Sequence, residues 1–200
     1  MQIGRHFFLH VAVMMLVWPA AAQNFVTNPN FDTDDMTLWN VPVIGDTTID
    51  WDPSDAFGVP PLGSARVVNM APGADLRGAY TNAFSNSVTA GALYDFGATI
   101  RMPQGQTATG QAYVDAYWCS DVECTNGWIS STSTPAVSAD GTWTLSMLTG
   151  QVAPTGAISV RVFLQVDKVD EGGQLEIYAD RVFFGPEGTT PVSLVSLGVE

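Results

Sequence analysis

The sequence predicts an all-β fold in which two antiparallel sheets pack against each other as a jelly-roll sandwich. Three observations lead to this fold class. Short runs rich in Val, Thr, Tyr, Phe and Trp alternate with clusters of Gly, Pro, Asn and Asp. The longest runs alternate apolar and polar residues with a period of two, as a half-buried strand does. No stretch after residue 22 shows a helical period of apolar residues.

The expected strands lie between turn signals rich in proline and glycine. These signals include Asp52-Pro53-Ser54, Pro103-Gln104-Gly105 and Asp170-Glu171-Gly172-Gly173. The expected strands span residues 37–43, 47–51, 64–70, 76–85, 93–102, 109–119, 128–131, 142–149, 157–166 and 174–184. In residues 93–102, the alternation buries Tyr94, Phe96, Ala98 and Ile100 and presents Asp95, Thr99 and Arg101.

The N-terminal residues 1–22 have the pattern of a secretory signal peptide. Arg5 precedes an apolar run at residues 7–18, and Ala20-Ala21-Ala22 offers a small-residue cleavage site. The run is shorter than the roughly 20 apolar residues that span a bilayer, although a retained anchor is the alternative. We therefore expect an exported β-sandwich at residues 23–188. A short tail at 189–200 would be an edge strand, a frayed end or the remnant of a linker.

The charge of the chain excludes some partners. It has 7 basic and 20 acidic residues and a formal charge of −13. Loss of Arg5 with the signal peptide leaves 7 − 1 = 6 basic residues and a charge of −14. Nucleic acids and anionic membranes are bound through basic surfaces, so neither is an expected partner, and no membrane span is expected after the signal peptide.

Cys119 and Cys124 are the only cysteines, and both histidines, His6 and His10, lie in the signal segment. In an exported protein two nearby cysteines predict a disulfide, which here would shape the loop after residues 109–119. Zinc is not expected, because no further soft ligands accompany the pair. Without a histidine after residue 22, catalytic triads that need one are excluded.

One predicted sheet face has the chemistry of a carbohydrate-binding surface. Residues 109–119 place Ala112, Val114, Ala116 and Trp118 on one face and polar or aromatic side chains on the other, and residues 157–166 do the same. If these strands share a sheet, its outer face carries Gln111, Tyr113, Asp115, Tyr117, Arg161, Phe163 and Gln165. Tyrosine rings can stack on sugars, while Arg, Gln and Asp can bond hydroxyls. An ordinary solvent-facing sheet with cross-strand pairs is the alternative.

Other exposed aromatic candidates are Trp51, Tyr80 and Trp128, and Trp128 could overhang the same site or cap the sandwich. Several short motifs occur in an order that resembles galactose-binding-like jelly rolls of the type found as carbohydrate-binding modules beside cellulases and xylanases. They are Asn24–Asp32 before Trp39, Leu62–Val67, Tyr94–Arg101, Gly141-x-Trp143, Ala153–Ala157 and Tyr178-x-Asp180-x-Val182.

The resemblance implies a ligand surface on a concave sheet face and core positions for Trp39 and Trp143. It also implies a structural calcium that joins the first and last strands. The matching positions here are Asp32 and Asp180, and Asn28 and Asn30 could add oxygens. Asp32 replaces a longer Glu and Arg181 replaces a second Asp, so Asp32 could instead cap a turn.

The leading functional hypothesis is an exported, non-catalytic protein of the carbohydrate-binding type, with an oligo- or polysaccharide as partner. The alternative is an extracellular structural or adhesion domain that keeps the sandwich without binding sugar. A third hypothesis is a glycan-active enzyme, which would need two carboxylates placed across a sugar. No segment of the sequence marks such a pair.

Overall fold

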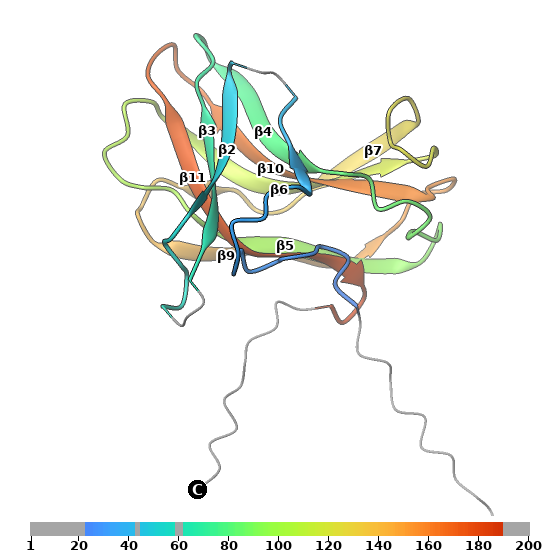
Figure 1. Cartoon of the computed structure of the whole chain (residues 1–200). Helices are drawn as coiled ribbons and strands as arrows, with labels where there is room; N and C mark the ends of the chain where they lie inside the picture. Colours follow the sequence, from blue (N-terminus) through green and yellow to red (C-terminus); the bar gives the residue numbers. More distant parts are fainter. Residues whose placement is uncertain (1–22, 43–44, 59–61, 190–200) are drawn as a thin grey trace, which may run out of the picture.

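The computed structural model describes residues 23–42, 45–58 and 62–189, and these form two antiparallel sheets packed face to face (Figure 1). Sheet A has the order β1 (Trp39–Asn40), β4 (Asp75–Thr81), β10 (Ser159–Lys168), β6 (Gly110–Cys119) and β7 (Trp128–Ser133), with β8 (Val137–Ser138) also beside β6. Sheet B has the order β2 (Thr47–Asp52), β3 (Ser64–Asn69), β11 (Leu175–Pro186), β5 (Leu93–Arg101) and β9 (Trp143–Val152). The predicted all-β sandwich is confirmed.

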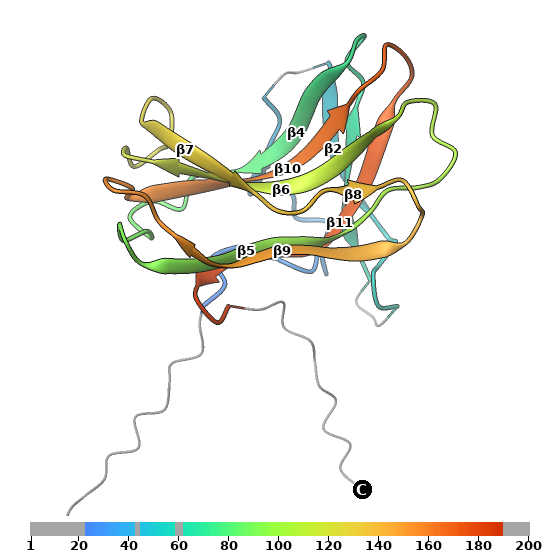
Figure 2. The same cartoon turned by 180° about the vertical axis from the view of Figure 1, so that it is seen from behind.

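The core lies between the sheets and is made by the apolar half of each alternating strand. In β10 the buried residues are Val160, Val162, Leu164 and Val166, and in β5 they are Tyr94, Phe96, Ala98 and Ile100. In Figure 2, β6 and β10 form the upper layer and β5 and β9 the lower one. Because the core takes these residues inward, strand geometry turns the intervening side chains of each sheet outward.

The two central strands come last along the described chain. β10 pairs with β4 on one side and with β6 on the other, and β11 pairs with β3 and with β5. The N-terminal segment runs beside β11, where the Phe25 amide donates to the Phe184 carbonyl at 2.8 Å. The Val182 amide donates to the Pro29 carbonyl at 2.9 Å, next to a register shift between Asp180 and Phe183.

Several details differ from the sequence-based expectations. The strand expected at residues 37–43 is limited to Trp39–Asn40, with Val43 outside the described residues, and β8 was not expected. Asp95 and Thr99 are buried instead of presented to solvent. Asp95 is buried because its carboxylate accepts hydrogen bonds from the amides of Gly150 and Gly188, both at 2.7 Å.

The two tryptophans expected in the core behave differently. Trp39 is buried in the core, as expected. Trp143 is not in the core, since it pairs with Arg101 on the outer side of sheet B and is half-buried. The expected signal peptide at residues 1–22 and residues 190–200 of the tail lie outside the described residues. No helix among the described residues is both long and apolar enough to cross a membrane.

Candidate ligand-binding face

The seven residues expected on one surface do lie together, because β6 and β10 are neighbours in sheet A. In the register of these strands, Arg161 pairs with Tyr117, Phe163 with Asp115, and Gln165 with Tyr113. From β4, Tyr80 pairs with Phe163 on the other side. We call this surface the sheet A face, made of Tyr80, Gln111, Tyr113, Asp115, Tyr117, Arg161, Phe163 and Gln165. The strand expected at residues 93–102 belongs to sheet B.

An aromatic row crosses the sheet A face from β4 to β6. The ring centroids of Tyr80 and Phe163 are 5.0 Å apart and those of Phe163 and Tyr117 are 4.2 Å apart. The Arg161 guanidinium carbon lies 5.0 Å from the Tyr80 ring centroid, a cation–π distance. The row therefore holds Arg161 at one place on the face, and its rings are partly covered by one another.

Tyr113 lies beyond this row, and no ring contact with another aromatic is found for it among the described residues. Burial, with a smaller contribution from the nearby charge of Asp115, raises the pKa of Tyr113 to about 12. Burial also raises the pKa of Tyr117. Both hydroxyls consequently stay protonated at neutral pH and can donate hydrogen bonds, and the Tyr113 ring is open to a stacking partner.

Asp115 and Gln165 form a buried polar pair below the aromatic rings, each only 4% exposed. Gln165 Nε2 donates to Asp115 Oδ2 at 3.0 Å and to the Tyr117 hydroxyl at 3.4 Å. We expected both side chains to be presented to solvent, but the neighbouring rings cover them. Burial raises the pKa of Asp115. The Ser133 hydroxyl on β7 lies opposite this carboxylate and, together with Gln165, partly offsets the rise, while Oδ1 itself is buried.

The expected disulfide between Cys119 and Cys124 is confirmed, with a Cα–Cα distance of 5.2 Å. It belongs to a loop at residues 120–127 that closes one end of the sheet A face. Arg161 Nη2 donates to the Glu123 carbonyl at 2.8 Å, and the Ser159 hydroxyl donates to the Asp121 carbonyl. The loop thus contacts the candidate site directly.

The carboxylate of Asp121 organises the interior of the same loop. It accepts the amides of Thr125, Asn126 and Gly127 at 3.1, 2.8 and 2.7 Å. These backbone hydrogen bonds lower the pKa of Asp121. Because three donors converge on one anion, the loop has a defined shape even though it is exposed.

Trp128 follows this loop at the start of the edge strand β7 and is 63% exposed. It pairs with Cys119, so it sits at the loop end of sheet A. Trp51, another candidate, is not free to bind a ligand, because its Nε1 donates to the Phe31 carbonyl at 2.8 Å and its ring packs on the core.

The sequence analysis did not single out Gly78, which lies below the sheet A face. Gly78 is in β4 and pairs with Gln165 of β10. A side chain at this position would clash with the Leu164 carbonyl and the Gln165 side-chain amide.

The four residues proposed for calcium differ in burial and in hydrogen bonding. Asp180 is 1% exposed, and its carboxylate accepts the amides of Ala56 at 3.3 Å and Arg181 at 2.6 Å. Burial, together with the nearby charge of Asp55, raises its pKa to about 6. Asp32 is exposed.

Asn28 is tied to its own turn, since its Nδ2 donates to the carbonyls of Thr33 at 3.0 Å and Asp35 at 3.3 Å. Asn30 is half-buried. Within the described ranges, no group of three or more His, Cys, Asp or Glu side chains could hold a metal. Calcium usually takes six to eight oxygens, so backbone carbonyls would have to complete this site. The calcium stays a prediction.

Comparisons with known proteins define the fold class. No protein-family model matches the chain, and no curated protein matches it. Solved structures do match. The C-terminal family 22 carbohydrate-binding module of Clostridium thermocellum Xyn10B superposes with a TM-score of 0.57 and 15% identity, over 86% of this chain and 99% of that one. The CBM22-2 xylan-binding domain of Paenibacillus barcinonensis Xyn10C gives 0.57 and 13%, over 79% and 97%.

The same fold also matches part of a much larger protein. The enzymatically active domain of tailspike protein 4 from bacteriophage CBA120 gives a TM-score of 0.61 and 13% identity, over 82% of this chain. The chain spans only 21% of that tailspike. At these identities the matches show the fold alone: a two-sheet β-sandwich like that of the CBM22 modules, which also superposes on part of the tailspike.

Proposed function

We propose that this protein is an exported, non-catalytic carbohydrate-binding protein whose ligand lies on the sheet A face. The observation that carries the proposal is the geometry of this face. β6 and β10 bring two tyrosines and Arg161 onto one outer surface, above the hydrogen-bonded pair of Asp115 and Gln165.

The surrounding side chains fit a sugar chain in the same way. The Tyr113 ring offers a face for a pyranose ring, and the hydroxyls of Tyr113 and Tyr117 can donate. Arg161, held over Tyr80 and bonded to the Glu123 carbonyl, presents a planar donor group at the loop end of the face. Xylan is the first ligand to test, since the matched modules include domains described as xylan-binding.

A binding rather than catalytic role is supported by the arrangement of carboxylates. Glycoside hydrolysis needs two carboxyl groups that act across the scissile bond. On the sheet A face, Asp115 is bonded to Gln165, and the neighbouring Asp167 accepts from Gln111 at 3.0 Å. Each acid is therefore engaged with an amide and not with another acid.

Export forms part of the proposal. The disulfide is the kind of bond that persists in oxidising compartments, and the pattern of residues 1–22 agrees with secretion.

One observation favours the alternative of a structural domain without ligand. The rings of Tyr80, Phe163 and Tyr117 stack on one another, which would stabilise the sheet even if no sugar bound.

Affinity electrophoresis against xylan and a panel of plant, algal and bacterial glycans tests the proposal. We expect retardation by at least one glycan, and Tyr113→Ala and Tyr117→Ala should each weaken it by about 1–3 kcal/mol as interface residues. Leu145→Ala, an exposed change on sheet B, is the matched control and should bind normally. Thermal melting of each variant checks the fold. Unchanged binding in the double tyrosine variant would remove the sheet A face as the site, and no binding to any glycan would favour the structural alternative.

A further inference from the structure

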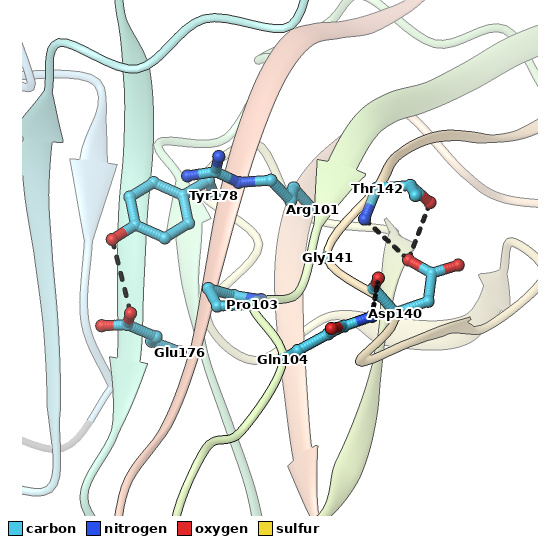
Figure 3. A pocket seen from close by; sticks show the side chains of 8 residues that line it. All are labelled: Arg101, Pro103, Gln104, Asp140, Gly141, Thr142, Glu176 and Tyr178. Carbon is cyan, nitrogen blue, oxygen red and sulfur yellow. Dashed lines mark hydrogen bonds between the residues drawn. The ribbon is translucent and has the colours of Figure 1, made fainter.

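A second concave site lies on the opposite side of the sandwich, at one end of sheet B. It has a volume of about 480 Å³, within the range of small-ligand pockets. Its walls come from three separate segments, as Figure 3 shows: the end of β5, the turn before β9, and β11. We call it the sheet B pocket, and its polar lining is Arg101, Gln104, Asp140, Thr142, Glu176 and Tyr178.

Arg101 is held in the pocket by two aromatic rings. The strand register places it between Tyr178 of β11 and Trp143 of β9. Its guanidinium carbon is 4.5 Å from the Tyr178 ring centroid and 5.2 Å from the Trp143 ring centroid. Such contacts engage the faces of a guanidinium and leave its N–H groups, which lie in the plane, free to donate.

Those donors have no protein partner in the described part of the chain. Arg101 Nε is buried and unbonded, as are the Nε atoms of Arg77 and Arg161, and no ion pair joins Arg101 to an acid there. Arg66 and Arg77, by contrast, are each paired with carboxylates. The planar guanidinium of Arg101 is therefore the polar group of the pocket with the most unused donors.

Acceptors on the other walls are equally well fixed. Glu176 is held by Arg66 through Oε2, at 2.9 Å from Nε and 2.5 Å from Nη2, and its Oε1 accepts the Tyr178 hydroxyl at 3.3 Å. Asp140 Oδ1 accepts the amide and hydroxyl of Thr142 at 2.8 and 2.7 Å. Both oxygens of Glu176 and one oxygen of Asp140 are thus held in place, and the lone pairs that remain on these carboxylates can serve a ligand.

Gln104, which follows the end of β5, contacts the turn before β9. Its Nε2 donates to the Asp140 carbonyl at 2.6 Å, as drawn in Figure 3, so its own carbonyl oxygen is left as an acceptor. The pocket thus presents both donors and acceptors at fixed positions. An alcohol group is both a donor and an acceptor, and neighbouring hydroxyls on a sugar ring match such a mixed lining.

Ions match the pocket less well. An anionic ligand would face Asp140 and Glu176 and a chain whose formal charge is −13. A cation would face the unpaired charge of Arg101. We propose that the sheet B pocket is a second glycan-binding site, which takes a neutral sugar unit at the end or at a branch of a chain. It shares only the ligand class with the proposed function and uses none of the same residues.

The position of the pocket defines its role. Core residues Ile100 and Ala179 point between the sheets, so their neighbours Arg101 and Tyr178 point outward from sheet B, away from the sheet A face. One protein molecule therefore engages two glycan chains, one on each side. Such two-sided binding cross-links a polysaccharide and raises its retention through avidity.

Side-chain NMR signals provide a direct test. In ¹⁵N-labelled protein, the Nε–H of Arg101 and the indole N–H of Trp143 should shift on titration with neutral oligosaccharides such as xylohexaose, cellohexaose, mannohexaose and galactobiose. The shifts should persist in the Tyr113→Ala/Tyr117→Ala variant. Arg101→Met keeps an apolar stem between the rings and removes the donors, so the affinity reported by the indole signal should fall at least tenfold. Should Arg101→Met not fold, Arg101→Lys, which lacks the planar fork, replaces it.

Two outcomes overturn the proposal. One is that no sugar of the panel moves the Arg101 and Trp143 signals up to millimolar concentration, and the other is that the affinity is unchanged in the Arg101 variants. Failure of the sheet A face alone gives a different result: its variants bind as the original protein does, while the pocket signals still respond. Turbidity with the polysaccharide form of the responding sugar should rise with the original protein and stay low when either site is removed.

Discussion

The two outer faces of the sandwich use arginine and aromatic rings in opposite ways. On the sheet A face the rings stack mainly on one another, and Arg161 is bonded to the Glu123 carbonyl. In the sheet B pocket the two rings contact Arg101 itself, and its donors are unbonded within the described residues. Both guanidinium groups have a buried Nε without a partner in the described part of the chain, so the contrast lies in the rings and in Arg161 Nη2, which is bonded.

The difference shows how one scaffold can offer two kinds of recognition. A row of rings across three strands suits an extended chain laid over the sheet, with hydrogen bonds from below. In the sheet B pocket, Arg101 is held between two rings, and the carboxylates of Asp140 and Glu176 lie on the other walls. This arrangement suits a single sugar unit at the end of a chain. Of the four predictions that follow, three change one side or its support and the fourth changes Asp180, which lies outside both faces; they run from the largest expected effect to the smallest.

Phe163→Ala should have the largest effect, since Phe163 is the middle ring of the aromatic row. Buried Phe→Ala changes cost about 3–5 kcal/mol, so a loss of roughly 2–3 kcal/mol in the free energy of unfolding is expected for this half-buried ring. Phe163→Leu, the control, keeps much of the volume. Arg101→Met on the opposite side should cost only about 1 kcal/mol, the size of its cation–π contacts. Urea unfolding measures all three, and equal losses on both sides would contradict the comparison.

Gly78→Ala tests how closely β4 and β10 approach below the sheet A face. An added Cβ would meet the Leu164 carbonyl and the Gln165 amide, so we expect a loss of about 1–3 kcal/mol and weaker glycan binding. Gly73→Ala is the matched control, because nothing lies within 4 Å of a Cβ there. A Gly78→Ala protein as stable as the control would mean that the strands move apart at little cost.

Removal of the disulfide affects only the loop end of the sheet A face. For so short a loop the chain-entropy estimate is about 2 kcal/mol. Cys119→Ser/Cys124→Ser should therefore lower the melting temperature modestly and weaken binding at the sheet A face, while the sheet B pocket signals stay unchanged. Intact-mass analysis after alkylation verifies the bond in the original protein, where two modified thiols would contradict it.

Asp180, which belongs to neither face, provides a test of pH dependence and of calcium. The folded-state pKa of Asp180 is raised to about 6 from 3.8, so the folded protein binds the proton more tightly than the unfolded chain. Its contribution to stability is therefore full below pH 3.8 and is lost as the pH rises through 6. Asp180→Asn should flatten this part of the stability profile, as measured by melting temperature against pH.

Calcium at this carboxylate would reverse that trend, because the metal favours the ionised form. A chelator at neutral pH should then lower the melting temperature of the original protein and leave Asp180→Asn unaffected. Equal melting temperatures with and without chelator would remove the calcium and leave the titration of Asp180 in place.

Strand alternation made the sheet A face predictable. A period of two assigned Tyr113, Tyr117 and Phe163 to one side of their strands, and the pairing of β6 with β10 brought them together. Alternation does not report what covers a side chain, so the burial of Asp115 and Gln165 under their neighbours was not foreseen. The sequence also does not report which strands pair, so the membership of residues 93–102 in sheet B follows only from the structure.

The sheet B pocket could not be predicted for a related reason. Arg101, Asp140 and Tyr178 come from segments far apart along the chain, and only the packing order of β11, β5 and β9 makes them neighbours. Trp143 illustrates the limit well. A tryptophan at the start of a strand resembles a core residue, and its position on the outer side follows only from its pairing with Arg101.

The central position of β10 and β11 determines when this chain can fold during its synthesis. Before residue 159 emerges, the pairings available among the described strands are β1–β4, β2–β3, β5–β9, β6–β7 and β6–β8. β10 then joins β4 to β6, and β11 joins β3 to β5. A nascent chain is therefore a set of separate hairpin-sized pieces with open edges, which chaperones can keep apart, and both sheets close together when the last two strands arrive.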